Sequence, residues 1–127
     1  MVLDSVAAAH DCRVAWSEQV AGAGTGLEGE MAKLAIVATI EVAPDRREEV
    51  VSHLMAHRAR CLRDEPGTLQ FEVLVPNEDA NKVLLYELYR DAAAFDEHWN
   101  GASIARFREE RSGIDIKISG TRCSLRE

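Results

Sequence analysis

Two residues in the second half of the chain, Glu87 and His98, have side chains suited to proton transfer. Glu87 shares an apolar strand face with Val83 and Leu85, and His98 lies in the helical stretch that follows this strand. A carboxylate beside an imidazole fixes its tautomer and raises its basicity, so His98 could act as a general base oriented by Glu87. The alternative is structural, with Glu87 accepting backbone hydrogen bonds and His98 binding loop carbonyls.

The spacing of the other histidines does not predict a metal site. His53 and His57 are four residues apart, as metal ligands on a helix often are, but residues 54–56 are Leu-Met-Ala and no HExxH motif is present. We therefore expect a solvated His53 and a partly buried His57. The chain has three cysteines: Cys12, Cys61 and Cys123. They form no CxxC pair, so we expect reduced thiols, as in a bacterial-type cytoplasm, without a catalytic role.

Several aromatic side chains could line a pocket for a flat substrate, although each of them is also an ordinary core residue. They are Phe71, Tyr86, Tyr89, Phe95, Trp99 and Phe107. Of these, Trp99, Tyr89 and Phe71 are our candidates for substrate contact. The glycines at 22–29 belong to no strand-to-helix unit, so neither flavin nor nicotinamide binding is predicted and we expect no cofactor.

The chain divides near residue 30. Residues 22–30 hold four glycines in nine positions, which indicates a linker after an N-terminal extension over 1–30. The regular patterning lies in 31–127. The net charge of −7 argues against a nucleic-acid or anionic-membrane partner, because both require basic patches. No apolar run is long enough for a membrane span, and the N-terminus does not read as a secretory signal, so we expect a cytoplasmic protein.

Apolar periodicity predicts four strands and two helical stretches in the order β-α-β-β-α-β. Asp91 is placed to cap the second helical stretch, which Asn100-Gly101 interrupts. The expected ranges are a strand at 34–42, a helix at 45–63, strands at 68–75 and 82–89, helices at 91–99 and 102–111, and a strand at 114–119.

The burial pattern of the strands predicts the sheet. The strands at 34–42 and 82–89 are apolar on both faces and must be covered on both sides, so they are central. This is the ferredoxin-like α+β arrangement, a four-stranded antiparallel sheet with helices on one face. The helices suffice for that face alone, so a second copy of the sheet is the expected cover for the other. We therefore expect a homodimer in which two sheets pack like an α/β barrel.

The domain resembles the antibiotic biosynthesis monooxygenase family over residues 33–122. The stretches that carry the resemblance are EPGTLQFEV at 65–73 and LYELYRD at 85–91, followed by Ala94, Phe95, His98 and Phe107. Members of this family commonly have a second histidine five residues after the first, where this chain has Ser103. Ser103 could hold a substrate oxygen, but capping of the helix start is the expected role.

The resemblance implies a dimer that oxidises a small aromatic substrate, such as a quinol or an anthrone, with O₂ and without a cofactor. His98 would then be the base and Glu87 its orienting partner, with Trp99 and Tyr89 as pocket walls. Two alternatives remain open. One is an isomerase or degrading enzyme for a small carbonyl compound, which would use the same base without O₂. The other is a non-enzymatic ligand-binding dimer, which the missing second histidine favours.

Overall fold

The structure, a computed structural model, describes residues 32–127. Its elements are β1 (Leu34–Val42), η1 (Pro44–Arg46), α3 (Arg47–Asp64), β2 (Thr68–Leu74), β3 (Lys82–Tyr89), α4 (Ala92–Trp99), α5 (Ala102–Glu110) and β4 (Ile116–Ser124). The predicted N-terminal extension and linker lie outside the described residues. No helix in the described part of the chain is long and apolar enough to cross a membrane.

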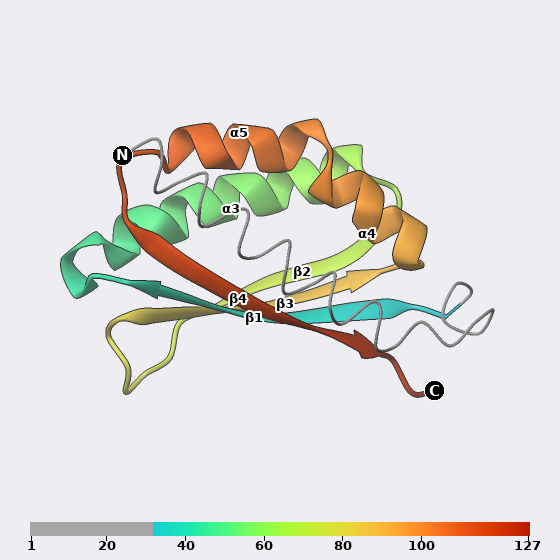
Figure 1. Cartoon of the computed structure of the whole chain (residues 1–127), viewed down its shortest axis with the longest axis horizontal. Coiled ribbons are helices and arrows are strands. Elements are labelled where there is room, and N and C mark those ends of the chain that lie inside the picture. Colours follow the sequence, from blue (N-terminus) through green and yellow to red (C-terminus); the bar gives the residue numbers. More distant parts are fainter. Residues whose placement is uncertain (1–31) are drawn as a thin grey trace.

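The four strands form one antiparallel sheet in the order β2-β3-β1-β4. The two strands that are apolar on both faces, β1 and β3, are central, which confirms the predicted topology. The helices α3, α4 and α5 all lie on the same face of the sheet, as Figure 1 shows. The described domain is therefore the ferredoxin-like α+β fold, with the second helical stretch divided in two at Asn100-Gly101.

The core lies between the sheet and the helices. Alternate residues of β3 point inward, so that Val83, Leu85, Glu87 and Tyr89 are buried. On the next strand, Ile36 and its alternate neighbours face the same side. Burial of this surface supplies most of the stabilisation of the domain, because apolar area removed from water contributes about 25 cal/mol per Å².

The local start and stop signals of the helices act as the sequence predicts. Asp91 caps α4 by accepting a hydrogen bond of 2.8 Å from the backbone N–H of Ala94. Acidic residues occupy the first turn of α3, and Arg63 lies in its last turn, which complements the helix dipole. Pro66 and Gly67 follow its end, and the backbone reverses there into β2.

The last strand differs from its predicted range, since it begins at Ile116 and continues to Ser124. Ser119, Gly120 and Thr121 are typical turn residues, but they continue the pairing with β1, where Gly120 lies opposite Ala38. The long partner strand supplies hydrogen bonds that override the low strand propensity of these residues.

The second strand also departs from simple alternation. A β-bulge between Thr68 and Gln70 places Thr68 and Phe71 in the interior, while Leu69 is exposed. Alternation over 68–75 predicts that Leu69, Phe71, Val73 and Val75 share one apolar face. This prediction is wrong at Leu69, and also at Val75, which lies beyond the strand end and is exposed. An inserted residue shifts the side-chain register on one side of the bulge.

Candidate active site

Three polar side chains meet in the interior between α3 and α4. His57 and Cys61 are one helical turn apart on α3 and therefore lie on the same helix face. His98 comes from the last turn of α4. The three side chains are 2%, 0% and 2% exposed, respectively. We call them the His-Cys-His cluster.

The atoms of the His-Cys-His cluster are within contact distance of one another. The Sγ atom of Cys61 lies 3.5 Å from Nε2 of His57 and 3.6 Å from Nδ1 of His98. The possible ligand atoms of the three residues all lie within 4.8 Å of one another, the only such group of histidine, cysteine and acidic residues among residues 32–127. From the sequence we expect a partly buried His57, whereas its ring lies in the core, because α5 and β2 cover this face of α3.

A carboxylate completes the site. Glu65 follows α3, and its Oε1 lies 2.9 Å from Nδ1 of His98. The same oxygen accepts a hydrogen bond of 2.8 Å from the hydroxyl of Thr68. When Nδ1 of His98 donates its hydrogen to Glu65, the lone pair is on Nε2, so this contact sets the tautomer of the ring.

The turn between α3 and β2 is packed closely against α4, and this packing positions Glu65. A Cβ atom added at Gly67 would lie 2.4 Å from the Cβ of Ala94. The backbone carbonyl of Gly67 also accepts a hydrogen bond of 2.8 Å from the N–H of Arg90. Only glycine fits this approach, so the Pro66-Gly67 pair that ends the helix also carries Glu65 to His98.

Glu87 is buried, but its hydrogen bond is made with Tyr89 and not with His98. It accepts a hydrogen bond from the hydroxyl of Tyr89, two residues along the same face of β3. The predicted pairing of Glu87 with His98 is therefore corrected: the carboxylate that hydrogen-bonds to His98 is that of Glu65. Glu87 remains close enough for the charge of His98 to act on it.

The two carboxylates of the site differ in their ionisation. Burial raises the pKa of Glu65, but the hydrogen bond and charge of His98, together with the Thr68 hydroxyl, outweigh it and leave this pKa below its ordinary value. Burial raises the pKa of Glu87, and the charge of His98 and the Tyr89 hydrogen bond only partly oppose this effect. Glu65 is thus held as the anion, and Glu87 is biased toward the neutral acid.

Three further titratable groups beside the site, His57, Cys61 and Tyr89, are held in their neutral forms. Burial lowers the pKa of His57 to about 3, and the charges of His98 and Arg60 act in the same direction. Burial likewise raises the pKa of the Cys61 thiol and that of the Tyr89 hydroxyl well above their usual values. At neutral pH the site therefore contains an uncharged imidazole, a thiol and a phenol.

Aromatic rings surround the two histidines. Phe71 and Phe107 each have a ring centroid 5.3 Å from that of His57. Tyr89 lies 5.4 Å from His98 by the same measure. Of the predicted substrate contacts, Phe71 and Tyr89 thus lie beside the site. Trp99 is half-buried and stacks on Phe95 at 6.2 Å.

Ser103 is buried against the His-Cys-His cluster and does not cap the helix start. The N-cap residue of α5 is Gly101, so the predicted capping role of Ser103 is wrong. A hydrogen bond from the Ser103 side chain lowers the pKa of Cys61 and that of Glu65, against the opposing effect of burial on each. At the family's second histidine position, this chain therefore has a small hydroxyl that points into the site.

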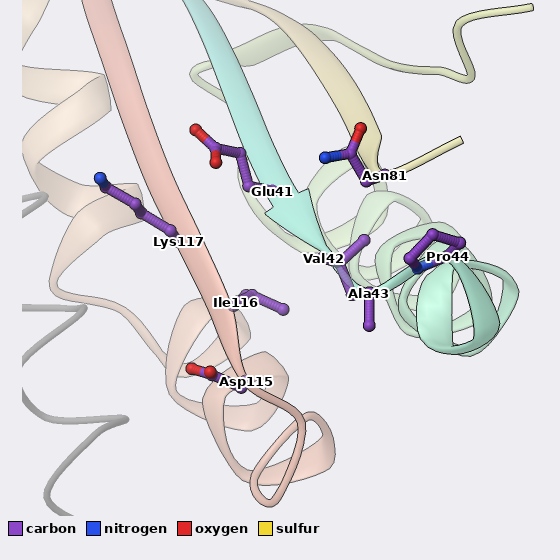
Figure 2. Close-up of a pocket in the computed structure, with 8 residues that line it drawn as sticks. All are labelled: Glu41, Val42, Ala43, Pro44, Asn81, Asp115, Ile116 and Lys117. Atoms are coloured by element: carbon purple, nitrogen blue, oxygen red, sulfur yellow. The ribbon is translucent and has the colours of Figure 1, made fainter. Parts of the chain in front are cut away.

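A surface hollow of about 350 Å³ lies elsewhere, where β1 ends and β4 begins. Figure 2 shows Glu41, Asn81, Asp115 and Lys117 around it. It lies at the Val42 end of β1, whereas Glu87 pairs with Ile36 near the other end. None of the cluster residues lines this hollow, so we do not assign it the chemistry of the site.

Sequence reasoning missed Glu65 and Cys61 as members of the site. The four-residue spacing of His57 and Cys61 was available in the sequence, but the pair His53 and His57 has the same spacing. His53 is only partly buried and does not belong to the cluster. The contact of Glu65 with His98 spans 33 positions and depends on the path of the turn, which the sequence pattern does not encode.

The fold and this interior define a class: a small ferredoxin-like α+β domain with a buried imidazole held by a carboxylate. The chain belongs to the antibiotic biosynthesis monooxygenase family, whose sequence model matches residues 34–110. This match spans β1 to α5, so it includes every residue of the site described above.

Solved structures show the same fold. A Caulobacter crescentus protein assigned by inference to the antibiotic biosynthesis monooxygenases superposes with a TM-score of 0.72 at 17% identity, over 79% of this chain and 95% of that one. A Pseudomonas aeruginosa protein gives 0.64 at 28% identity, over 78% and 100%. A Nitrosomonas europaea protein with the same inferred assignment gives 0.68 at 18%, over 76% and 92%. The comparison with curated proteins gives no match.

Proposed function

We propose that this protein is a cofactor-independent monooxygenase that oxidises a small electron-rich aromatic compound of the quinol or anthrone type with O₂. The observation that carries the proposal is the pair formed by His98 and Glu65, a buried imidazole whose tautomer is set by an ionised carboxylate. Membership of the antibiotic biosynthesis monooxygenase family supports the reaction type.

In the proposed reaction the substrate itself supplies the electrons. Nε2 of His98 takes a proton from the substrate, and Glu65 stabilises the imidazolium that forms. The resulting carbanion or phenolate passes one electron to O₂, and the two radicals combine to form a carbon–oxygen bond. The imidazolium protonates the peroxide. Loss of water then converts an anthrone-type CH₂ group to a carbonyl, so that one O₂ is consumed and one H₂O released.

The surroundings of His98 suit such a reaction. Aromatic rings exclude water from the ring of His98, which protects a carbanion from protonation by solvent. Tyr89 and Ser103 provide hydroxyl groups beside the site that can hold a substrate oxygen. Glu87, which burial biases toward its neutral form, holds the Tyr89 hydroxyl in place and in this role positions Tyr89.

Oxygen uptake with a panel of hydroquinones and anthrones tests the proposal. We expect His98→Gln to lower uptake by a factor on the order of 10² to 10⁴, the usual contribution of a general base. His53→Gln is the matched control, because His53 lies on α3 outside the site, and it should leave uptake unchanged. Absence of uptake by the wild-type protein across the panel would remove the proposal.

The burial of His98 favours a second candidate, a ligand-binding dimer without turnover. The His98 side chain is only 2% exposed, and its own aromatic neighbours occupy the space around it. This candidate predicts affinity for the aromatic panel without consumption of O₂. An isomerase or degrading enzyme for a carbonyl compound would instead form product under anaerobic conditions.

The homodimer is part of the same proposal. The sheet face opposite α3, α4 and α5 carries the apolar side chains Val37, Leu74, Leu84, Tyr86 and Leu88, and Val37 is 50% exposed. On the edge strands of this face, Glu72 of β2 and Ser119 and Thr121 of β4 are polar. A second copy placed on this face would cover the apolar centre and leave the polar rim in water.

A further inference from the structure

We propose that the His-Cys-His cluster is a binding site for a single Zn²⁺ ion, with Nε2 of His57, Sγ of Cys61 and Nδ1 of His98 as ligands. Imidazole nitrogen and cysteine sulfur are the ligands that Zn²⁺ prefers in proteins. Two helices supply them, with His57 and Cys61 on one face of α3 and His98 on α4. The site therefore needs no CxxC or HExxH motif.

The distances from the sulfur of Cys61 to the two ligand nitrogens match a tetrahedral zinc centre. With Zn–S near 2.3 Å and Zn–N near 2.0–2.1 Å, a tetrahedral angle places the sulfur and each nitrogen about 3.6 Å apart. The Sγ atom of Cys61 lies 3.5 Å from Nε2 of His57 and 3.6 Å from Nδ1 of His98. Both sulfur–nitrogen distances thus agree with the separation of two ligand atoms in a zinc tetrahedron, and the two nitrogens lie within 4.8 Å of each other.

The surroundings of the cluster favour a cation. The carboxylate of Glu65 lies 2.9 Å from Nδ1 of His98 and would have to leave this nitrogen when Zn²⁺ binds there, which makes it one candidate for the fourth ligand position. A water molecule is the other candidate for that position. Ser103 lies beside Cys61 and provides a hydroxyl for the bound thiolate. On binding, Zn²⁺ displaces the thiol proton of Cys61 to solvent, and the proton on Nδ1 of His98 moves to Nε2, so the ring stays neutral.

Metal binding and base catalysis exclude each other at His98. With Zn²⁺ on Nδ1, the neutral ring carries its proton on Nε2 and has no lone pair for the substrate. The bound metal would therefore inhibit the enzyme, a consequence that rests on the proposed function. The metal site itself does not depend on it, and its test below uses no turnover.

Titration with Co²⁺, a spectroscopic substitute for Zn²⁺, tests the site. We expect one equivalent to bind and to give a thiolate-to-cobalt charge-transfer band together with visible bands of tetrahedral intensity. Excess Zn²⁺ should remove these bands, and Mg²⁺ should not, because it prefers oxygen ligands. Refolding in the presence of the metal removes slow access to the buried site as a cause of a negative result.

Variants assign the bands to the cluster. Cys61→Ser should lose the charge-transfer band. His57→Gln should weaken metal binding more than about 10-fold, since even residues that only hydrogen-bond to a metal ligand contribute 10-fold or more to the affinity. Cys123→Ser is the matched control, because Cys123 lies on β4 outside the cluster, and it should bind as the wild type does. A charge-transfer band that persists in Cys61→Ser would overturn the proposal.

A measurement on the wild-type protein avoids any effect of these substitutions on folding. X-ray absorption of the zinc-loaded protein should show one sulfur at about 2.3 Å and two or three nitrogen or oxygen atoms at about 2.0–2.1 Å. A shell without sulfur, or the absence of a bound equivalent after refolding with metal, would overturn the proposal and leave the oxygenation reaction untouched.

Discussion

At the scale of single residues, the position of the proton on the His98 ring depends on Glu65. Glutamine at this position would still accept hydrogen bonds from His98 and Thr68 through its oxygen, but it carries no charge. We therefore expect Glu65→Gln to fold normally and to lower turnover by a factor on the order of 10². Steady-state oxygen uptake and thermal melting on the same sample measure both effects.

The control for this substitution is Glu109→Gln, which changes an exposed carboxylate on α5. It should affect neither turnover nor melting. Full specific activity of Glu65→Gln would mean that the charge of Glu65 has no part in the reaction.

Glu87 makes the stability of the domain depend on pH. Its pKa is raised by burial, against the charge of His98 and the Tyr89 hydrogen bond, and the carboxylate of Glu65 raises it further. Above the ordinary glutamate pKa of about 4.3, the folded state therefore binds more protons than the unfolded state. The free energy of unfolding consequently falls as the pH rises from about 4.3 through the raised pKa of the folded state. The nearby thiol of Cys61 stays neutral in this range.

Glu87→Gln removes this titration, so its free energy of unfolding should fall less than that of the wild type over the same pH range. Each unit of pKa difference corresponds to about 1.4 kcal/mol. Urea unfolding at several pH values from 4 upward measures the difference. Parallel pH profiles for the two proteins would show that Glu87 titrates normally, and a large loss of stability at every pH would indicate an unmet N–H donor of the amide.

The residues of the site were predictable only in part. The sequence places Glu87 and Tyr89 on one strand face and His98 on the same helix side as Phe95, because strand alternation and helix period decide which residues share a face. It does not identify Glu65, because a Glu-Pro-Gly stretch indicates the end of a helix whether or not its carboxylate turns back into the core. Partners distant in sequence depend on backbone paths that no local pattern specifies.

At the scale of the elements, the turn between α3 and β2 is held by its fit against α4. Gly67→Ala would place a Cβ atom 2.4 Å from that of Ala94, so either the turn or α4 must move. Overpacking of this kind costs about 1–3 kcal/mol. We expect lower stability in urea unfolding, and also lower turnover because Glu65 moves with the turn.

Removing the opposing methyl group tests the cause. Ala94→Gly alone should destabilise by about 1 kcal/mol through helix propensity. In the double variant Gly67→Ala with Ala94→Gly, the contact between the two methyl groups no longer exists. The double variant should therefore lose less stability than the sum of the losses of the two single variants. If the losses of stability simply add, the destabilisation by Gly67→Ala does not come from the contact with Ala94.

The elements themselves followed from the sequence where periodicity was strong. The range of β1 and that of β3 agree with prediction to the residue, since both strands carry apolar residues on both faces. The last strand was misplaced, because its continuation through Gly120 depends on the neighbouring strand and not on its own residues. Tertiary pairing decided its boundary.

At the scale of the whole molecule, the open face of the sheet should decide the oligomeric state. Val37 is half-exposed at the centre of this face, so an aspartate there is tolerated in a single chain. Between two sheets the same charge would be buried without a partner, at a cost of several kcal/mol. We expect Val37→Asp to be a folded monomer by light scattering after size exclusion.

Met55→Asp is the matched control for this change. Met55 is similarly exposed but lies on α3, on the other side of the molecule from the open face. It should leave the dimer intact. A dimeric and folded Val37→Asp protein would contradict packing through the sheet.

The pairing of β1 with β4 also has a consequence for the kinetics of folding. Leu34 lies opposite Ser124, so this ladder closes a loop of about 90 residues, and contacts of such long range form slowly. Until β4 docks, one edge of the central strand β1 exposes its N–H and C=O groups to other chains. Variants that delay this last pairing should therefore lower the refolding yield at high protein concentration, even where the stability of the finished domain is unchanged.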